Sequence, residues 1–453
     1  MTYPREWIKI ELSTFVDLQN GFAFKSKTYQ EGGDFVIRIG NVQDGYVSLN
    51  NPAYVDADEL NAQRFRLQNN DLLLSLTGNV GRVARIKEDQ LPAVLNQRVA
   101  RALPSKFVYR QWVYYLLRSN NVQSEVQSAA KGAAQLNIST KDLLSILCEV
   151  PPYSEQKAIA DKLDTSLVQV ATIKSRLEGT LETLKQFRQS VLADAVSGKL
   201  TEDWRNSSLS EWQQVKLIDV VESKPRNGKS PKGVDYATSY RNLTLSAITT
   251  GKFIENKFKF VELDIDSYSH LWVKNGDILI QRANTIDYVG VSAIYGGEDD
   301  KYVYPDLIMK CRPNNDALGK FLHLTLLSDK VRKYFRDNAT GTAGNMPKIN
   351  QQVVSNAPVA LPTIAEQQEI VNRVEKLFAG ADATEQQVNQ ALARVNNLTQ
   401  SILAKAFRGE LTEQWRKDNP ELISGENSAE ALLDKIKAER AQIKPKRNTR
   451  KKA

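Results

Sequence analysis

Hydrophobic residues recur at every seventh position along two separate segments of the chain. The first series is Leu163, Val170, Leu177, Leu184 and Val191, and the second is Val374, Ala381, Val388, Val395 and Ile402. A sustained seven-residue repeat places a narrow apolar stripe on a helix, and a second helix of the same period buries that stripe. The two equal stripes predict two long helices that pair with each other, although each helix packing only on its own domain stays open.

Proline and glycine mark the ends of these helices. Pro151-Pro152 and Pro362 precede them, and Gly198 and Gly409 follow them, as expected where helices begin and stop. Each helix then has about 40 residues and measures roughly 60 Å at ~1.5 Å per residue. The intermediate position of the heptad also holds apolar residues, namely Ile173, Phe187 and Leu398.

Outside these helices, short runs of aliphatic and β-branched residues alternate with turn residues. The runs begin at Phe35, Asp71, Asp277 and Tyr288, and are bounded by Gly, Asn and Asp. Such runs are typical of strands joined by tight turns. Ser13–Leu18 is expected to form a short helix. The predicted fold class is α+β, with two β-rich mixed α/β domains separated by two long helices that pair as an antiparallel coiled coil.

The chain is internally duplicated. Residues 155–205 match residues 366–416 without a gap, at a constant offset of 211 (366 − 155), and fainter matches at offsets of 205 to 209 precede them. The identical pairs in the best block are Gly198/Gly409, Leu200/Leu411, Thr201/Thr412, Trp204/Trp415 and Arg205/Arg416. The repeat predicts a pseudo-two-fold arrangement of variable domain, helical region, variable domain and helical region. The expected boundaries are 1–150, 151–205, 206–360 and 361–416, followed by a C-terminal helix and basic tail at 417–453.

Charge alone says little about the partner. The 453 residues carry a formal net charge of +8, which suggests an acidic partner such as nucleic acid. Residues 440–453 hold seven basic residues and no acidic one, so the rest of the chain has a net charge of only +1 (8 − 7). Any DNA surface must therefore come from local placement of basic residues.

The sequence offers no catalytic or metal-binding constellation. Two cysteines and two histidines, all isolated, exclude a disulfide framework and a Cys-rich zinc site. Val150-Pro-Pro-Tyr153 resembles a methyltransferase motif, but valine cannot accept the hydrogen bond that the motif requires. Gly228-Lys-Ser230 lacks the first glycine of a phosphate-binding loop. We therefore expect a non-catalytic, metal-free chain. With no long apolar run and no apolar leader, it is expected to be cytoplasmic.

The candidate ligand-binding residues are polar and lie between the predicted strands. Arg, Lys, Asn and Gln can form paired hydrogen bonds with base edges. The first domain offers Arg38, Asn41, Thr77, Asn79, Lys131, Gln135 and Asn137. The second offers Arg241, Arg282, Asn284, Asn345, Lys348 and Asn350. Taken one at a time, each also fits ordinary turn chemistry.

Two matched helices carrying a variable domain at each end form a spacer with two heads. That geometry suits a split DNA site whose halves flank unread bases. The alternative is a two-headed coiled-coil scaffold that binds protein, whose binding would depend only mildly on salt. A single-chain enzyme with an unrecognised site is disfavoured by the missing motifs.

The whole chain resembles the specificity subunit of a type I restriction–modification system, most closely the type IA family. The resemblance is strongest over Leu392–Arg416 and continues through Asn419–Ser428 into Ala431–Arg440. Gly21-Phe-Ala-Phe-Lys-Ser26 and Gly276-Asp-Ile-Leu-Ile280 are similar to signatures of its target recognition domains.

The resemblance implies a role in sequence choice. Each target recognition domain would read one half of a bipartite, asymmetric double-stranded DNA site, and the helices would fix the spacer between the halves. Two modification subunits would bind S-adenosylmethionine and methylate adenine at N6. Two restriction subunits would add ATP- and Mg-dependent translocation and cleavage. This chain would hold no cofactor itself.

Overall fold

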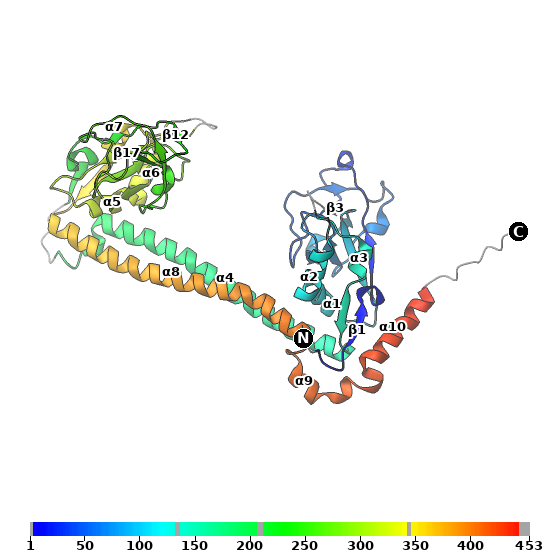
Figure 1. Ribbon diagram of the computed structural model, residues 1–453. Coiled ribbons are helices and arrows are strands. Elements are labelled where there is room, and N and C mark those ends of the chain that lie inside the picture. The colour runs from blue at the N-terminus through cyan, green and yellow to red at the C-terminus, as the bar shows by residue number, and fades with distance from the viewer. Residues whose placement is uncertain (1–2, 132–135, 206–211, 342–345, 444–453) are drawn as a thin grey trace. The chain divides into compact units, whose positions relative to one another are not determined.

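The chain forms two compact units in a computed structural model that describes residues 3–131, 136–205, 212–341 and 346–443. The first unit comprises residues 1–176 and 391–453, and the second comprises residues 177–390. Two helices contribute to both units: α4 (Tyr153–Ser197) and α8 (Ile364–Phe407). Each unit therefore combines one variable domain with a part of each long helix (Figure 1).

The long helices pair antiparallel, which confirms the predicted coiled coil. In the first unit, Ile159 and Leu163 near the start of α4 share a core with Leu403 near the end of α8. In the second unit, Val191 near the end of α4 shares a core with Val374 near the start of α8. The start of each helix thus packs against the end of the other.

In each heptad, the residue of the seven-residue series is buried or partly buried. Leu163, Val170, Val191, Val374, Ala381, Val388 and Val395 are buried, and Leu177, Leu184 and Ile402 are partly buried. The intermediate residues Ile173, Phe187 and Leu398 are instead 45%, 39% and 42% exposed. The second row of shielded residues lies four positions after the stripe and includes Leu167, Leu181, Phe378 and Leu392. Because an α-helix has ~3.6 residues per turn, either flank of the stripe can face the partner helix, and here the i+4 flank does.

The described residues of the first variable domain form three sheets. Strand β1 (Ile8–Glu11) pairs antiparallel with β9 (Leu147–Val150) next to the start of α4. A four-stranded antiparallel sheet has the order β2-β8-β5-β6, and a three-stranded sheet has the order β4-β3-β7. The strand bounds are β2 Val16–Asn20, β3 Asp34–Ile37, β4 Tyr54–Val55, β5 Leu72–Ser75, β6 Val83–Arg85, β7 Ala93–Leu95 and β8 Val99–Pro104.

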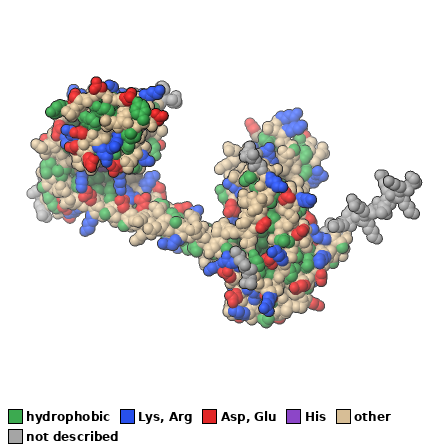
Figure 2. Space-filling model, viewed as in Figure 1, with side chains coloured by type: hydrophobic (Ala, Val, Ile, Leu, Met, Phe, Trp, Pro, Cys, Tyr) green, Lys and Arg blue, Asp and Glu red, His purple; other side chains and the backbone are tan. Residues whose placement is uncertain are grey.

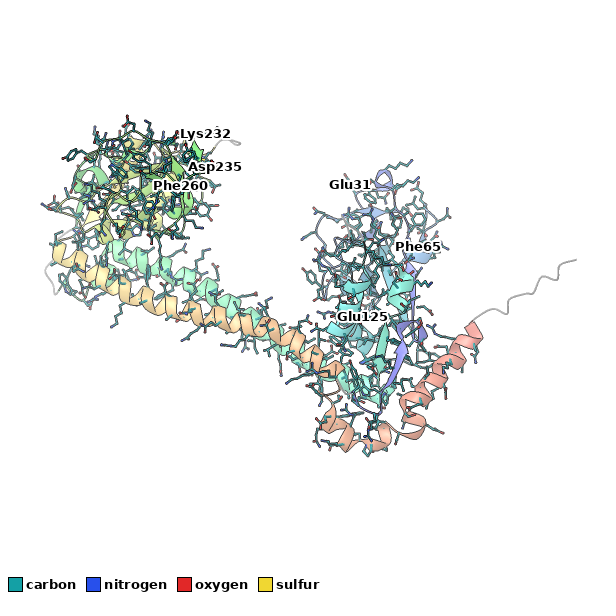
Figure 3. The ribbon with its side chains drawn as sticks, viewed as in Figure 1. Glu31, Phe65, Glu125, Lys232, Asp235 and Phe260 are labelled. Carbon is teal, nitrogen blue, oxygen red and sulfur yellow. The ribbon has the colours of Figure 1, made fainter. Side chains whose placement is uncertain are left out.

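The described part of this domain also contains the α-helices α1 (Arg110–Arg118), α2 (Asn120–Ala129) and α3 (Thr140–Leu144). The core of the smaller sheet includes Phe65 (Figure 3). The helix predicted at Ser13–Leu18 is wrong, because only Leu12–Thr14 form a 3-10 turn and Val16–Asn20 form β2. Pairing of β2 along β8, from Val16 with Pro104 to Asn20 with Ala100, overrides the local helix signals.

The second variable domain repeats this arrangement. Strand β10 (Gln213–Lys216) pairs with β18 (Pro358–Leu361), and the two sheets have the orders β11-β17-β15-β16 and β12-β14-β13. The strand bounds are β11 Arg226–Asn227, β12 Gly233–Val234, β13 Tyr240–Leu243, β14 Phe258–Val261, β15 Ile278–Gln281, β16 Ser292–Ile294 and β17 Ile308–Cys311. The helices are α5 (Gly319–Leu327), α6 (Asp329–Asp337) and α7 (Gln351–Ser355). Phe260 lies on β14 of the three-stranded sheet, and Lys232 and Asp235 flank β12; all three side chains are labelled in Figure 3.

After α8, the C-terminal region returns to the first unit. Helices α9 (Glu413–Asp418) and α10 (Ala429–Ile443) follow Gly409. Leu432 and Ile436 of α10 join the core of the first domain. Near the end of α10, Arg440 forms an ion pair with Asp17 of β2 at 3.1 Å.

Candidate nucleic-acid interface

Four candidate residues of the first domain come together at the turn after β5. The segment 136–138 runs beside 76–78, with hydrogen bonds from Gly78 N to Leu136 O at 2.8 Å and from Ile138 N to Leu76 O at 3.0 Å. The Thr77 hydroxyl donates to Asn137 Oδ1 at 2.9 Å. The backbone of Lys131 is bridged to that of Asn137. Lys131, Asn137 and the nearby Asn79 are exposed.

The second domain builds the same backbone frame with different side chains. Ile349 N donates to Arg282 O at 2.9 Å, and Asn284 N donates to Pro347 O at 3.3 Å. Lys348 occupies the position of Asn137 and is bridged to Ala283, which occupies the position of Thr77. Arg282 and Asn284 are partly buried and Lys348 is exposed. One polar cluster therefore forms in each domain, from Thr77, Asn79, Lys131 and Asn137 in the first and from Arg282, Asn284 and Lys348 in the second, with different side chains on a common backbone frame.

Several candidate side chains already have partners within the protein. Asn41 is 2% exposed, accepts from Arg38 N, and donates to Ser48 O at 2.9 Å and Asn50 O at 3.2 Å. These hydrogen bonds hold the β3–β4 loop together. Arg38 itself lies on this loop, 5.9 Å from the Tyr29 ring centroid.

In the second domain, Asn350 caps α7 by accepting from Val353 N at 2.8 Å. The amide of Asn284 donates to Gln281 Oε1 at 2.7 Å. The guanidinium of Arg241 lies 5.6 Å from the centroid of the Phe258 ring. Gln135 and Asn345 lie outside the described residues.

Two residues that the sequence did not single out hold the turns of the polar clusters. Gln123 on α2 donates through Nε2 to Gly81 O at 2.8 Å. At the equivalent place on α6, Arg332 donates to the carbonyl oxygens of Val289 and Asp287. Burial lowers the pKa of Arg332 to about 10, which still leaves it charged at neutral pH. Gln123 and Arg332 occupy matching positions in the two repeats, and this correspondence is the sequence signal that could have pointed to them.

A cleft separates each variable domain from the neighbouring long helix. In the first unit it measures about 450 Å³ and lies between the β5–β6 turn, α2 and Gln400 of α8. In the second unit it measures about 330 Å³ and lies between the equivalent turn, α6 and Gln189 of α4. Gln189 and Gln400 are themselves repeat partners, so the clefts are equivalent places in the two units.

Metal-binding groups and reactive thiols were sought among the described side chains. No group of three or more His, Cys, Asp or Glu side chains among them could hold a metal ion. Burial raises the pKa of both Cys148 and Cys311 to about 12, so these thiols are poor nucleophiles. None of the described helices combines the length and apolarity that a membrane span requires. Figure 2 shows basic and acidic side chains intermixed on the visible face of each domain, as the nearly neutral body of the chain suggests.

A comparison with protein families decides between the two function classes. The family model described as "Type I restriction modification DNA specificity domain" matches residues 4–183 and 209–394. The chain belongs to the type I restriction–modification specificity subunits. The two matched ranges each span one variable domain and a large part of the long helix that follows it. Each variable domain therefore lies within a range that matches the specificity-domain model.

Relatives match this specificity subunit over nearly its whole length. It is 36% identical over 461 residues to the "Type I restriction enzyme EcoKI specificity subunit" of Escherichia coli K12, covering 99% of both chains. It is 35% identical over 460 residues to the StySPI specificity subunit of Salmonella potsdam, again covering 99% of both. These relatives support the assignment to the type IA branch that the sequence suggested.

Solved structures show the same fold. A chain from a study of "complex assembly and conformational transition of the type I R-M system" matches with a TM-score of 0.69 at 16% identity, covering 90% of this chain and all of that one. The HsdS subunit of Thermoanaerobacter tengcongensis matches with a TM-score of 0.55, also at 16% identity, covering 90% of this chain and 98% of that one. The α+β fold with paired long helices is thus shared with known specificity subunits.

Proposed function

We propose that this chain selects the DNA site on which a type I restriction–modification complex acts. Each target recognition domain reads one half of a bipartite, asymmetric sequence, and α4 and α8 set the number of unread bases between the halves. Two modification subunits with S-adenosylmethionine methylate adenine at N6. Two restriction subunits with ATP and Mg cleave unmodified DNA. The chain itself supplies no cofactor and performs no chemical step.

One observation carries the proposal beyond family membership: the polar clusters share a backbone frame but differ in side chains. Thr77, Lys131 and Asn137 in the first domain correspond to Ala283, Thr340 and Lys348 in the second. Amide and cationic side chains prefer different base edges, because an amide matches adenine and a cation matches guanine. Two equivalent readers with different chemistry are expected to read unequal half-sites.

The helices have the dimensions of a spacer. At ~1.5 Å per residue, the 45 residues of α4 give a helix of about 68 Å, comparable to two turns of B-DNA at ~3.4 Å per base pair. Most stripe residues of α4 and α8 are buried. Two paired helices of this length support the proposal that two half-sites are read with unread bases between them.

The test is genome-wide mapping of N6-methyladenine in cells that carry the modification-subunit gene, with and without the gene for this chain. We expect a split motif with two unequal halves and a constant number of unread bases, methylated only when this chain is present. Methylation that does not depend on this chain would favour the protein-binding scaffold instead. In that case, binding of the purified complex to DNA should also lack the steep decrease with added salt that phosphate contacts cause.

A further inference from the structure

A buried carboxylate joins three separate segments of the first unit. Glu155, in the first turn of α4, is fully buried. Its Oε1 accepts hydrogen bonds from the Thr412 hydroxyl at 2.6 Å and from the Arg416 guanidinium, and its Oε2 accepts from Trp7 Nε1 at 2.9 Å. Trp7 precedes β1 of the recognition domain, whereas Thr412 and Arg416 follow the end of α8. We call this group the first node.

The second unit contains the same group, atom for atom. Glu366, in the first turn of α8, accepts at Oε1 from the Thr201 hydroxyl at 2.8 Å and from Arg205 Nη1 at 2.6 Å. Its Oε2 accepts from Trp212 Nε1 at 3.2 Å. The second arginine nitrogen donates to a helix-ending glycine in both nodes, Gly409 in the first and Gly198 in the second. This second node therefore joins the end of α4, the start of α8 and the second recognition domain.

The residue after each glutamate ties the same helix to a second point of the domain. Gln156 accepts from Tyr109 N, just before α1, at 2.8 Å. Gln367 accepts from Leu318 N, just before α5, at 2.7 Å. Each domain is thus held at two places, next to its first strand and next to its first α-helix (α1 or α5). Both places are bound by adjacent side chains of one turn of α4 or α8. Two anchoring points restrict rotation about either one.

The buried carboxylate of each node requires hydrogen-bond donors in defined positions. A carboxylate out of contact with water is tolerated only when donors occupy its oxygens in good geometry. Here an arginine, a threonine and a tryptophan from different segments must all lie in position at once. Apolar packing alone tolerates sliding better than such directional bonds do. A cleft lies between each recognition domain and a long helix of the same unit, so packing does not fill all the space between domain and helix.

We propose that Glu155 and Glu366 are positioning residues, each setting the orientation of its own recognition domain on the helix pair and thereby the accuracy with which that domain reads its half-site. The inference rests on the proposed function. It adds that the accuracy of reading depends on residues remote from the polar clusters, and that each node controls one half-site only. The node's role is mechanical, since it lies buried among protein segments.

The experiment compares five variants in cells that express the modification subunits. Glu155→Gln and Glu366→Gln each replace the carboxylate of one node by a neutral amide. Trp7→Phe and Trp212→Phe remove only one donor and keep an aromatic ring. Glu182→Gln removes an exposed carboxylate from α4, outside both nodes, and is the matched control. Methylation is mapped genome-wide at equal abundance of the chain, and occupancy is compared between cognate sites and sites with one mismatch in either half.

Glu155→Gln should lower discrimination against mismatches on the order of tenfold in one half-site, the scale of one lost base contact, and leave the other half unchanged. Glu366→Gln should do the same in the opposite half. The phenylalanine variants should show smaller changes in the same halves, and they keep the test decisive if a glutamine variant does not fold. The control should read like the unaltered chain.

Three outcomes would overturn the inference: equal loss of discrimination in both halves, both nodes affecting the same half, or unchanged discrimination in all node variants. An effect on abundance or cognate methylation alone would likewise assign the nodes a purely stabilising role. Failure of the proposed function is distinguishable, because then the unaltered chain would direct no methylation at all.

Discussion

The helix pair makes a stability prediction that separates the buried flank of the stripe from the exposed one. Leu163 on α4 is fully buried against the end of α8, in a core that includes Leu403 and Ala406. Leu163→Ala removes three carbons from this contact and leaves a cavity between the helices. The expected loss is about 3 kcal/mol in the free energy of unfolding of the first unit. Ile173→Ala on the same helix is the matched control, because Ile173 is 45% exposed and its truncation should cost no more than ~0.5 kcal/mol.

The assay is thermal unfolding of the purified full chain, with hydrogen exchange used to assign the change to a unit. A loss of this size should lower the melting temperature of the first unit by about 6–12 °C. Exchange should accelerate in α1 (Arg110–Arg118) of the first unit and stay unchanged in α5 (Gly319–Leu327) of the second. Equal destabilisation by Leu163→Ala and Ile173→Ala would refute the helix register described above.

Three further predictions concern single side chains. Arg332→Ala should destabilise the second unit by ~1–3 kcal/mol, because the carbonyl groups of two turn residues lose their donor. Hydrogen exchange should accelerate in the turn after β15, and an unchanged exchange rate there would contradict this prediction. Burial lowers the pKa of His323 below its ordinary 6.5. As the pH falls, the imidazole is therefore protonated at a higher pH in the unfolded chain than in the folded chain. The stability of the second unit should therefore fall as pH drops below ~6.5, and thermal scans of His323→Gln should show a shallower fall. If Lys131 and Lys348 contact phosphate, alanine at either should reduce the salt dependence of DNA binding by the complex by about one counterion, and an unchanged slope would exclude that contact.

The long helices could be predicted from sequence because their signal is periodic and local. A residue every seventh position fixes a helical face without reference to the rest of the chain, and the duplication supplied the partner helix. The flank of the stripe that faces the partner could not be predicted. Positions i+3 and i+4 lie on opposite sides of the same stripe, and apolar residues occupy both, as Ile173 and Leu181 show.

Side-chain roles in the candidate site were less predictable than its location. Both polar clusters lie where turn residues follow a predicted strand, and the structure brings Thr77 and Asn137 together across 60 residues of sequence. Residue type alone does not tell whether an amide is free, however. Asn41 and Asn79 have the same chemistry, yet the β3–β4 loop encloses Asn41 whereas the β5–β6 turn leaves Asn79 exposed. That difference depends on how the loop folds back on its own carbonyl groups.

The burial of the node glutamates could not be predicted from their local sequence, but comparison of the two repeats points to it. Glu155 bonds to residues 148, 257 and 261 positions away, and on a polar helix its sequence context gives no sign of burial. Comparison of the two repeats would have exposed it, because Glu155-Gln156 and Glu366-Gln367 are identical at the start of otherwise divergent helical turns. Within an internally duplicated chain, matching polar residues in a divergent context point to buried partners.

The repeats in the sequence and the compact units in space are not the same objects. Each repeat runs from a recognition domain through the following helix, whereas each unit takes the start of one helix and the end of the other. The node of each unit therefore needs residues from both repeats: Glu155 and Trp7 come from the first, and Arg416 comes from the second. A single repeat would lack the donors for its own buried carboxylate. This interdependence explains physically why helix ends and domain starts share the same Trp, Glu, Thr and Arg chemistry in both halves, whereas the polar clusters differ.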